Sequence, residues 1–111
     1  MSSIVKVFQP TGILERNTAA LLSREISNVV NSGADTVLLD LKEVTFIDSS
    51  GLSALVTIKK KLQTAGAKLY ICSIKNQVGV MFKLTRMERV FQIFANRNEF
   101  ESDILAQNSQ S

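Results

Sequence analysis

The hydrophobic positions of this chain follow two different periods, and segments of one kind alternate with segments of the other. Short runs of β-branched and apolar residues are typical of strands, whereas apolar residues recurring every three or four positions are typical of helices. The predicted strands cover residues 4–8, 12–15, 36–41, 68–72 and 90–94. The predicted helices begin near residues 17, 49, 76 and 98. Strands that alternate with helices along the chain indicate an α/β fold.

The order of these elements, β-β-α-β-α-β-α-β-α, predicts a single α/β domain with a mixed sheet of four to five strands packed by about four helices. The last three strands are separated by helices, so we expect them to lie parallel. The second run follows the first after a short connection, which predicts a hairpin around Pro10, Thr11 and Gly12 and at least one antiparallel strand. We expect the whole chain, 1–111, to form this domain, with a polar frayed tail at about 107–111.

Polar residues and glycines mark where the predicted helices begin and end. Asn17 or Thr18 is expected to cap the first helix, and Asn76 the third, because a short polar side chain can accept hydrogen bonds from the free N–H groups there. Gly33 and Gly66 are expected to end the first and second helices, since glycine adopts a positive φ without steric cost.

Composition narrows the possible chemistry. The 111 residues contain no His and a single Cys, Cys72, so a serine–histidine nucleophile, a histidine-ligated metal and an internal disulfide are all excluded. The three lysines at 59–61 have no aromatic residue near them, and a solvated helix end explains them better than direct nucleic-acid binding. The start of the chain lacks the pattern of a signal peptide and no run is long enough for membrane insertion, so we expect a cytoplasmic protein.

One segment has residue types that packing of the hydrophobic core does not explain. Asp48, Ser49, Ser50 and Gly51 follow an apolar pair and open the second predicted helix. A carboxylate and two hydroxyls therefore lie where the first N–H groups of a helix are unpaired, and such a terminus favours an added phosphate ester. A simple N-cap would explain these residue types, but a cap needs one oxygen and three candidates are adjacent. Gly51 also keeps the turn free of side-chain bulk.

Residues 44–52, Val-Thr-Phe-Ile-Asp-Ser-Ser-Gly-Leu, resemble the signature of STAS domains, in particular bacterial anti-sigma factor antagonists. The likeness extends over essentially the whole chain, through residues 38–41, 68–71, 84–87 and 90–93. The second serine of the pair is the phosphoacceptor in that family, so the resemblance implies phosphorylation of Ser50. A shift of one residue in register would assign it to Ser49. The residues implied to bind the partner are Asp48, Ser49, Ser50, Gly51 and Leu52.

The sequence allows more than one role for the residues in this segment. Ser49 caps the helix or packs against the turn, and Asp48 orients the Ser50 hydroxyl, shapes the partner surface or acts as a second cap. Gly51 permits close approach of a partner or only shapes the turn. Leu52 is expected in the core rather than at an interface.

The resemblance implies a partner-switching regulator of transcription that is not itself an enzyme. The unphosphorylated protein would bind an anti-sigma factor with serine-kinase activity and so release a sigma factor. Phosphorylation would end that binding, and a metal-dependent serine phosphatase would restore it. The ATP and magnesium belong to the kinase, so we expect no cofactor or metal in this chain, which would be a monomer or weak dimer.

Other functions remain open at this point. STAS domains also serve as scaffold subunits of stress-sensing assemblies and of lipid-transport ABC complexes. A hydrolase that uses Ser50 as nucleophile is disfavoured because no His or Lys base accompanies the motif. The chain also departs from the usual family pattern, because Glu15 stands where an Asp is common and the net charge is +3.

Overall fold

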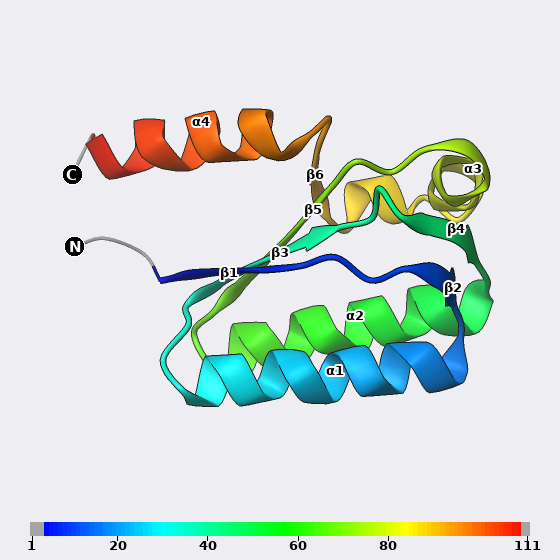
Figure 1. Ribbon diagram of the computed structural model, residues 1–111, viewed down its shortest axis with the longest axis horizontal. Coiled ribbons are helices and arrows are strands. Elements are labelled where there is room, and N and C mark those ends of the chain that lie inside the picture. Colours follow the sequence, from blue (N-terminus) through cyan, green and yellow to red (C-terminus); the bar gives the residue numbers. More distant parts are fainter. Residues whose placement is uncertain (1–3, 110–111) are drawn as a thin grey trace.

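The computed structural model describes residues 4–109, with side chains up to residue 104 and at residue 106. This part of the chain is an α/β fold with four α-helices, as the sequence predicts, and it has six strands (Figure 1). The strands are β1 Val5–Phe8, β2 Gly12–Leu14, β3 Thr36–Asp40, β4 Val44–Ile47, β5 Lys68–Cys72 and β6 Gln92–Phe94. The helices are α1 Arg16–Asn31, α2 Ser49–Thr64, α3 Asn76–Leu84 and α4 Arg97–Ser109, with a 3-10 helix, η1, at Met87–Arg89.

All strand pairs among residues 4–109 are parallel. Four strands form a sheet in the order β1-β3-β5-β6, and β2 pairs with β4 beside it. The prediction of an antiparallel opening hairpin is therefore wrong. The segment after Pro10 keeps its direction because the N–H of Gly12 donates to the carbonyl of Glu43 at 2.9 Å, so β2 pairs with the chain that follows β3.

Strand β4 lies where the sequence suggests only a connection. Its two end residues, Val44 and Ile47, are buried, whereas Thr45 and Phe46 between them are exposed. This burial pattern does not alternate, so the period that identifies a half-buried strand is missing. The pairing with β2, which depends on residues more than thirty positions earlier, is what makes the segment a strand.

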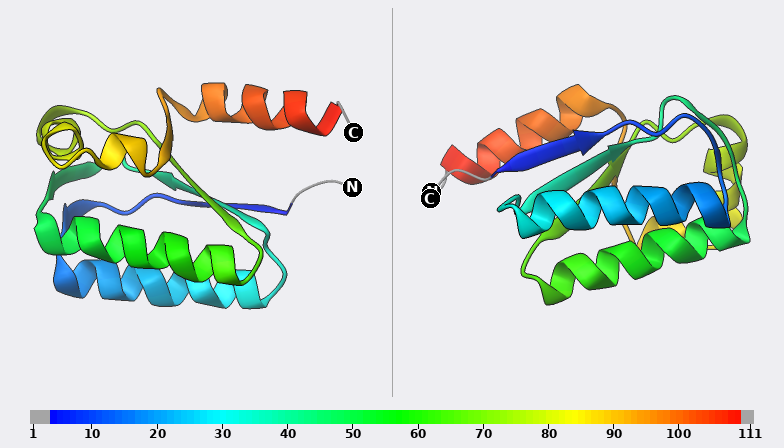
Figure 2. Two further views of the ribbon diagram at one scale, coloured as in Figure 1. Left: turned by 180° about the vertical axis from the view of Figure 1, so that it is seen from behind. Right: turned by 60° about the horizontal axis from the view of Figure 1, so that its bottom comes forward.

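The sheet separates two groups of helices. Figures 1 and 2 show α1 and α2 side by side on one face and α4 on the other. Residues 36–40 are buried throughout, and β3 lies between β1 and β5, where the sequence predicts a strand at 36–41. The larger core lies between the sheet and α1 and α2, and a smaller one lies under α4, where the rings of Tyr70 and Phe94 pack against Phe100 at 5.5 and 5.4 Å between centroids.

Glu15 caps helix α1 in place of the predicted Asn17 or Thr18. Its carboxylate accepts the N–H groups of Asn17 and Thr18, each at 3.0 Å, and the Thr18 hydroxyl accepts the N–H of Glu15 at 3.0 Å. This reciprocal pair is a capping box in which Glu and Thr have exchanged their usual positions. The exchange is possible because the longer Glu side chain still reaches the two N–H groups.

The other predicted helix ends have mixed outcomes. Gly33 and Gly66 adopt positive φ angles of 116° and 76° one residue beyond the C-caps of α1 and α2, as predicted. Asn76 does not cap α3; the N-cap is Lys75, without a side-chain hydrogen bond, and Asn76 is the first helical residue. Helix α4 reaches Ser109, so the predicted tail at 107–111 is helical at its start, and residues 110 and 111 lie outside the described residues.

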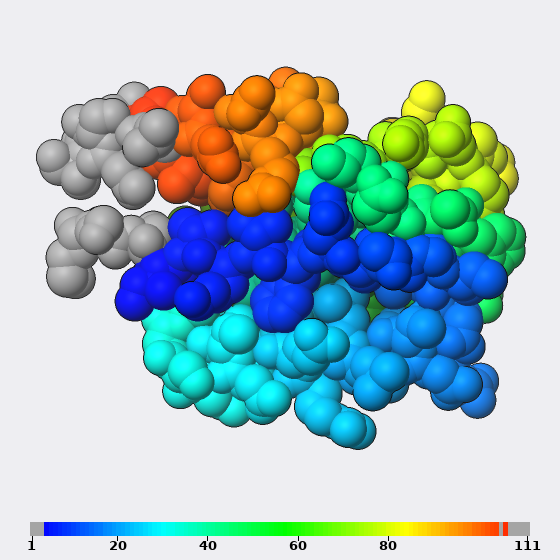
Figure 3. Space-filling view, viewed as in Figure 1, coloured from blue at the N-terminus to red at the C-terminus, as the bar shows by residue number. Residues whose placement is uncertain are grey.

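The arrangement brings the first turns of α1 and α2 to the same end of the molecule, next to β2 and β4 (Figure 1). The space-filling view shows β1 and the segment after it along one face of the molecule, between α1 and α4 (Figure 3). Within residues 4–109, no helix combines the length and the hydropathy that a membrane crossing requires.

Candidate functional site

The segment singled out by the sequence forms the junction between β4 and α2. Ile47, at the end of β4, is fully buried, and both its backbone groups pair with the side-chain amide of Gln77 from α3. Oε1 of Gln77 accepts from the Ile47 N–H at 3.0 Å, and Nε2 donates to the Ile47 carbonyl at 3.1 Å. The sequence gives no sign of this role for Gln77, because it depends on how α3 packs against β4.

Asp48 is the N-cap of α2 and also holds the hydroxyl of Ser50. Its Oδ1 accepts the backbone N–H of Gly51 at 2.8 Å and the Oγ hydroxyl of Ser50 at 2.7 Å. These two hydrogen bonds, the one from Gly51 above all, lower the pKa of Asp48 below its ordinary value. Two of the alternatives for Asp48, a cap and a group that orients Ser50, are therefore combined in one carboxylate.

The lowered pKa gives a pH-dependent prediction for Asp48→Asn. A carboxyl with a lower pKa in the folded than in the unfolded state stabilises the fold above the unfolded pKa and loses this effect as the pH falls through the folded pKa. We expect the variant to unfold at lower denaturant concentration than the wild type at pH 7, and the difference to shrink as the pH falls below the unfolded-state pKa of about 3.9. Denaturant midpoints measured from pH 7 to pH 2 check this.

A matched control is Glu88→Gln, which removes an exposed carboxylate in η1. We expect only a small effect from it across the same range. If the Asp48→Asn difference stayed constant from pH 7 to pH 2, the charge of Asp48 would have no part in stabilising the turn.

The two serines differ in exposure and in bonding. Ser50 is half-buried and its hydroxyl is directed by Asp48, whereas Ser49 is exposed and its hydroxyl bonds to no other residue in the described part of the chain. Ser49 therefore does not cap the helix, since Asp48 already does so. Of the pair, Ser50 has the oriented hydroxyl.

Gly51 lies beneath the turn against β2, and Leu52 lies in the core. A methyl group added at Gly51 would clash with the carbonyl oxygen of Leu14 in β2 and lie 2.9 Å from Cγ1 of Ile47. The N–H of Asp48 donates to the same Leu14 carbonyl at 3.3 Å. The close approach that glycine permits is thus to β2, and Leu52, 3% exposed, belongs to the core as expected.

Two shallow grooves flank the first turn of α2, and each contains one of the serines. A groove of about 410 Å³ between α1 and α2 is lined by Arg16, Ala19, Ala20, Ser23, Ser50, Ser53, Ala54 and Thr57. A more apolar one of about 340 Å³ lies between α2 and the chain after α3, lined by Ser49, Leu52, Ser53, Val56, Thr85 and Met87. Neighbouring hydroxyls therefore belong to two different surfaces.

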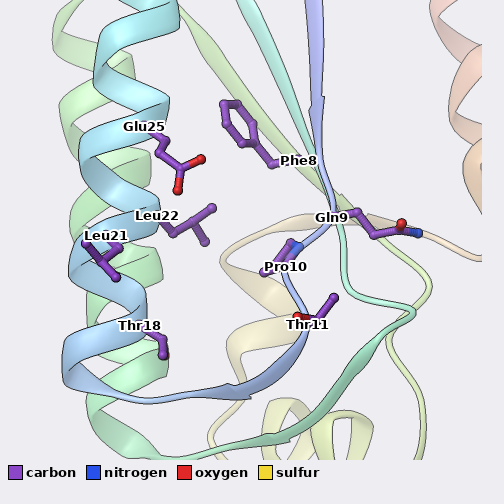
Figure 4. A pocket seen from close by; sticks show the side chains of 8 residues that line it. All are labelled: Phe8, Gln9, Pro10, Thr11, Thr18, Leu21, Leu22 and Glu25. Atoms are coloured by element: carbon purple, nitrogen blue, oxygen red, sulfur yellow. The ribbon is translucent and has the colours of Figure 1, made fainter.

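A further pocket, of about 370 Å³, lies on another face of α1 (Figure 4). Leu22 and Glu25 of α1 face Phe8 and Pro10 across it, and it shares no residue with the groove that contains Ser50. Within the described residues, no group of three or more Cys, Asp or Glu side chains is placed to hold a metal ion. The pocket therefore adds no metal-binding side chains to the site around Ser50.

Cys72 lies in the smaller core and is fully buried. Burial raises the pKa of its thiol, so the reactive thiolate is disfavoured. Cys72 therefore has a structural role. The polar groups of the candidate site are those of Asp48 and Ser50.

Comparisons with known proteins agree with this geometry. The sequence model of one family, described as the STAS domain, matches residues 2–100. The anti-sigma factor antagonist BtrV of Bordetella bronchiseptica, a candidate by its name, is 27% identical over 86 residues, which are 78% of this chain and 74% of that protein. The anti-sigma-B factor antagonist of Staphylococcus aureus is 24% identical over 82 residues, covering 74% and 76% of the two chains.

A solved structure gives the same fold. The crystal structure of a candidate anti-sigma factor antagonist from Thermotoga maritima is 25% identical, with a TM-score of 0.80, and the alignment covers 90% of this chain and 86% of that one. The likeness therefore extends from the motif to the arrangement of strands and helices.

Proposed function

Since the chain belongs to the STAS domain family, we propose that it is an anti-sigma factor antagonist switched by phosphorylation of Ser50. The observation that carries the proposal is the half-buried Ser50 hydroxyl, held by Asp48 at 2.7 Å on the first turn of α2 and lining a groove open to a partner. The relatives named as antagonists support the same role.

The partner of the unphosphorylated form is, on this proposal, an anti-sigma factor with serine-kinase activity. Its docking surface is the first turn of α2 together with the two grooves beside it, so that Ser49 and Ser50 contact the partner directly. Gly51 and Leu52 shape this surface from beneath, because Gly51 lies against β2 and Leu52 is buried in the core. Binding of the antagonist occupies the anti-sigma factor and leaves the sigma factor free.

The kinase then transfers the γ-phosphoryl group of ATP to Ser50. A bond forms between phosphorus and Oγ, the bond between that phosphorus and the bridging oxygen of ADP breaks, and the hydroxyl proton leaves. Asp48 orients the hydroxyl, but hydrogen bonding lowers its pKa, so the kinase supplies the general base. The chain itself is therefore a substrate and a binding module, not an enzyme.

A metal-dependent serine phosphatase completes the cycle. Water attacks the phosphorus, the bond to Oγ breaks, and inorganic phosphate leaves with the serine hydroxyl restored. We place the exchange in the cytoplasm, with this protein as a monomer or weak dimer that makes no direct contact with nucleic acid and does not insert into a membrane.

Mapping the acceptor tests the proposal. A partner captured with the unphosphorylated protein is incubated with it and ATP, and phosphate is located by mass spectrometry on the tryptic peptide 43–59, which contains both serines. We expect one phosphate on Ser50, complete loss of phosphorylation in Ser50→Ala, and normal phosphorylation in Ser49→Ala, because only the Ser50 hydroxyl is oriented by Asp48.

Ser49→Ala is also the matched control, since it removes a hydroxyl one residue away that makes no hydrogen bond within the described residues. Phosphate on Ser49 in the wild type, or full phosphorylation of Ser50→Ala, would contradict the assignment.

A further inference from the structure

We propose that Arg16 binds the phosphate on Ser50 and holds it in the groove between α1 and α2. This inference rests on the proposed function, in which Ser50 is the acceptor. It assigns to Arg16, the first residue of α1, a positioning role in the phosphorylated state.

The fold brings Arg16 and Ser50 to the same place. The first turn of α2 lies against Leu14, whose carbonyl accepts the N–H of Asp48 at 3.3 Å and leaves no space for a side chain at Gly51. Arg16 follows Leu14 by two residues, and both Arg16 and Ser50 line the α1–α2 groove. Residues 34 positions apart in the sequence thus share one depression.

Arg16 is the one charged residue among the eight that line this groove; the others are Ala, Ser or Thr. Its side chain is exposed and forms no hydrogen bond or ion pair with another residue of the described chain. The nearest acidic neighbour in sequence, Glu15, is already bonded to the N–H groups of Asn17 and Thr18. The guanidinium is therefore available for a new anion.

Phosphorylation removes the bond that now directs Ser50 toward Asp48. The ester oxygen carries no proton to donate to Oδ1 of Asp48, and the phosphate and this carboxylate repel each other. The phosphate gains by moving away from Asp48 into the groove, where Arg16 can donate two parallel hydrogen bonds to its oxygens. Phosphorylation thereby exchanges an Asp48 contact for an Arg16 contact.

The test uses phosphoserine installed at position 50 during translation, so it needs no kinase or partner. Phosphorus NMR of the intact protein, recorded from pH 4 to pH 9, gives the second pKa of the phosphate. We expect Arg16→Gln to raise that pKa by about 0.5, because a nearby guanidinium favours the dianion to the extent of an exposed ion pair. Arg16→Lys should restore most of the lower value, since it keeps the charge.

Arg24→Gln is the matched control. It removes the same charge from an exposed position further along α1, outside the groove. We expect it to leave the pKa unchanged, and 1 M salt, which screens charges over about 3 Å, to remove most of the Arg16 effect. An unchanged pKa in Arg16→Gln, or an equal shift in both Gln variants, would overturn the role of Arg16.

Failure of this inference is distinct from failure of the proposed function. The titration reports on Arg16 whether or not a kinase modifies Ser50 in the cell, and acceptor mapping with Ser50→Ala reports on the kinase whether or not Arg16 binds the product. Circular dichroism of each variant confirms that the compared proteins are folded.

Discussion

Phosphoserine at position 50 is expected to weaken binding of the anti-sigma partner by at least about a hundredfold while the fold stays intact. The modification adds about −1.5 to −2 charges at pH 7 and three acceptor oxygens to a half-buried position in the proposed interface. Docking would strip water from this charge, which exceeds the single positive charge of Arg16, at a cost of several kcal/mol. Each 1.4 kcal/mol corresponds to a tenfold change in affinity.

Calorimetric titration of the partner with unmodified and phosphorylated protein measures this effect. A protein with phosphoserine at position 32 is the control, because Ser32 is exposed at the opposite end of α1 from the site. We expect it to bind like the unmodified protein, and amide NMR spectra of both phosphoproteins to show the same fold. Equal affinity of the unmodified and Ser50-phosphorylated forms would refute the switch.

Gly51→Ala is expected to destabilise the protein by about 2–4 kcal/mol. The added methyl would clash with the carbonyl oxygen of Leu14 and press on Ile47, both of which belong to strands in the β2–β4 pair. A backbone carbonyl cannot change rotamer to make room, so α2 must shift away from β2. Such overpacking costs more than the gain of about 0.5–1 kcal/mol that Gly→Ala brings in an open helix.

The chain offers a matched control for this prediction. Gly79 is also helical, in α3, but a methyl group added there would meet nothing within 4 Å. We expect Gly79→Ala to be neutral or stabilising by up to about 1 kcal/mol. Guanidinium unfolding of both variants gives the comparison. Similar free energies of unfolding for Gly51→Ala and Gly79→Ala would show that α2 is not held tightly against β2.

Local signals in the sequence mark the segment that carries the proposed site. In residues 48–51, three oxygen-bearing side chains are adjacent, although one is enough to cap the helix that begins there. Neighbouring residues in the sequence do not reveal which of these side chains caps the helix and which hydroxyl is held by a hydrogen bond. Ser49 and Ser50 point in directions that differ by one helical step. Helix α1 packs on one side of α2 and the segment after α3 on the other, so the two serines line separate grooves.

The errors in the predicted fold have two different origins. Pro10 and Gly12 are typical of a reversing turn, yet the chain keeps its direction because β2 finds its partner in β4, more than thirty residues later. Asn17 was a reasonable cap by residue type, but Glu15 reaches the same N–H groups. The direction of β2 depends on a long-range pairing, whereas the cap of α1 depends on hydrogen bonds between residues two and three positions apart.

The amino-acid sequence by itself determined the α/β class, the strand at 36–40, the helices and the place of the segment around Ser50 at the start of one of them. These follow from the periodicity of apolar residues and from short-range hydrogen bonding, both of which are written in neighbouring residues. Only the tertiary structure decided that all strands pair in parallel, that Gly51 packs on Leu14, and that Arg16 shares a groove with Ser50. Those relations join residues far apart in the chain, and they exist only because burying the apolar faces of α1, α2 and the sheet together brings the segments into contact.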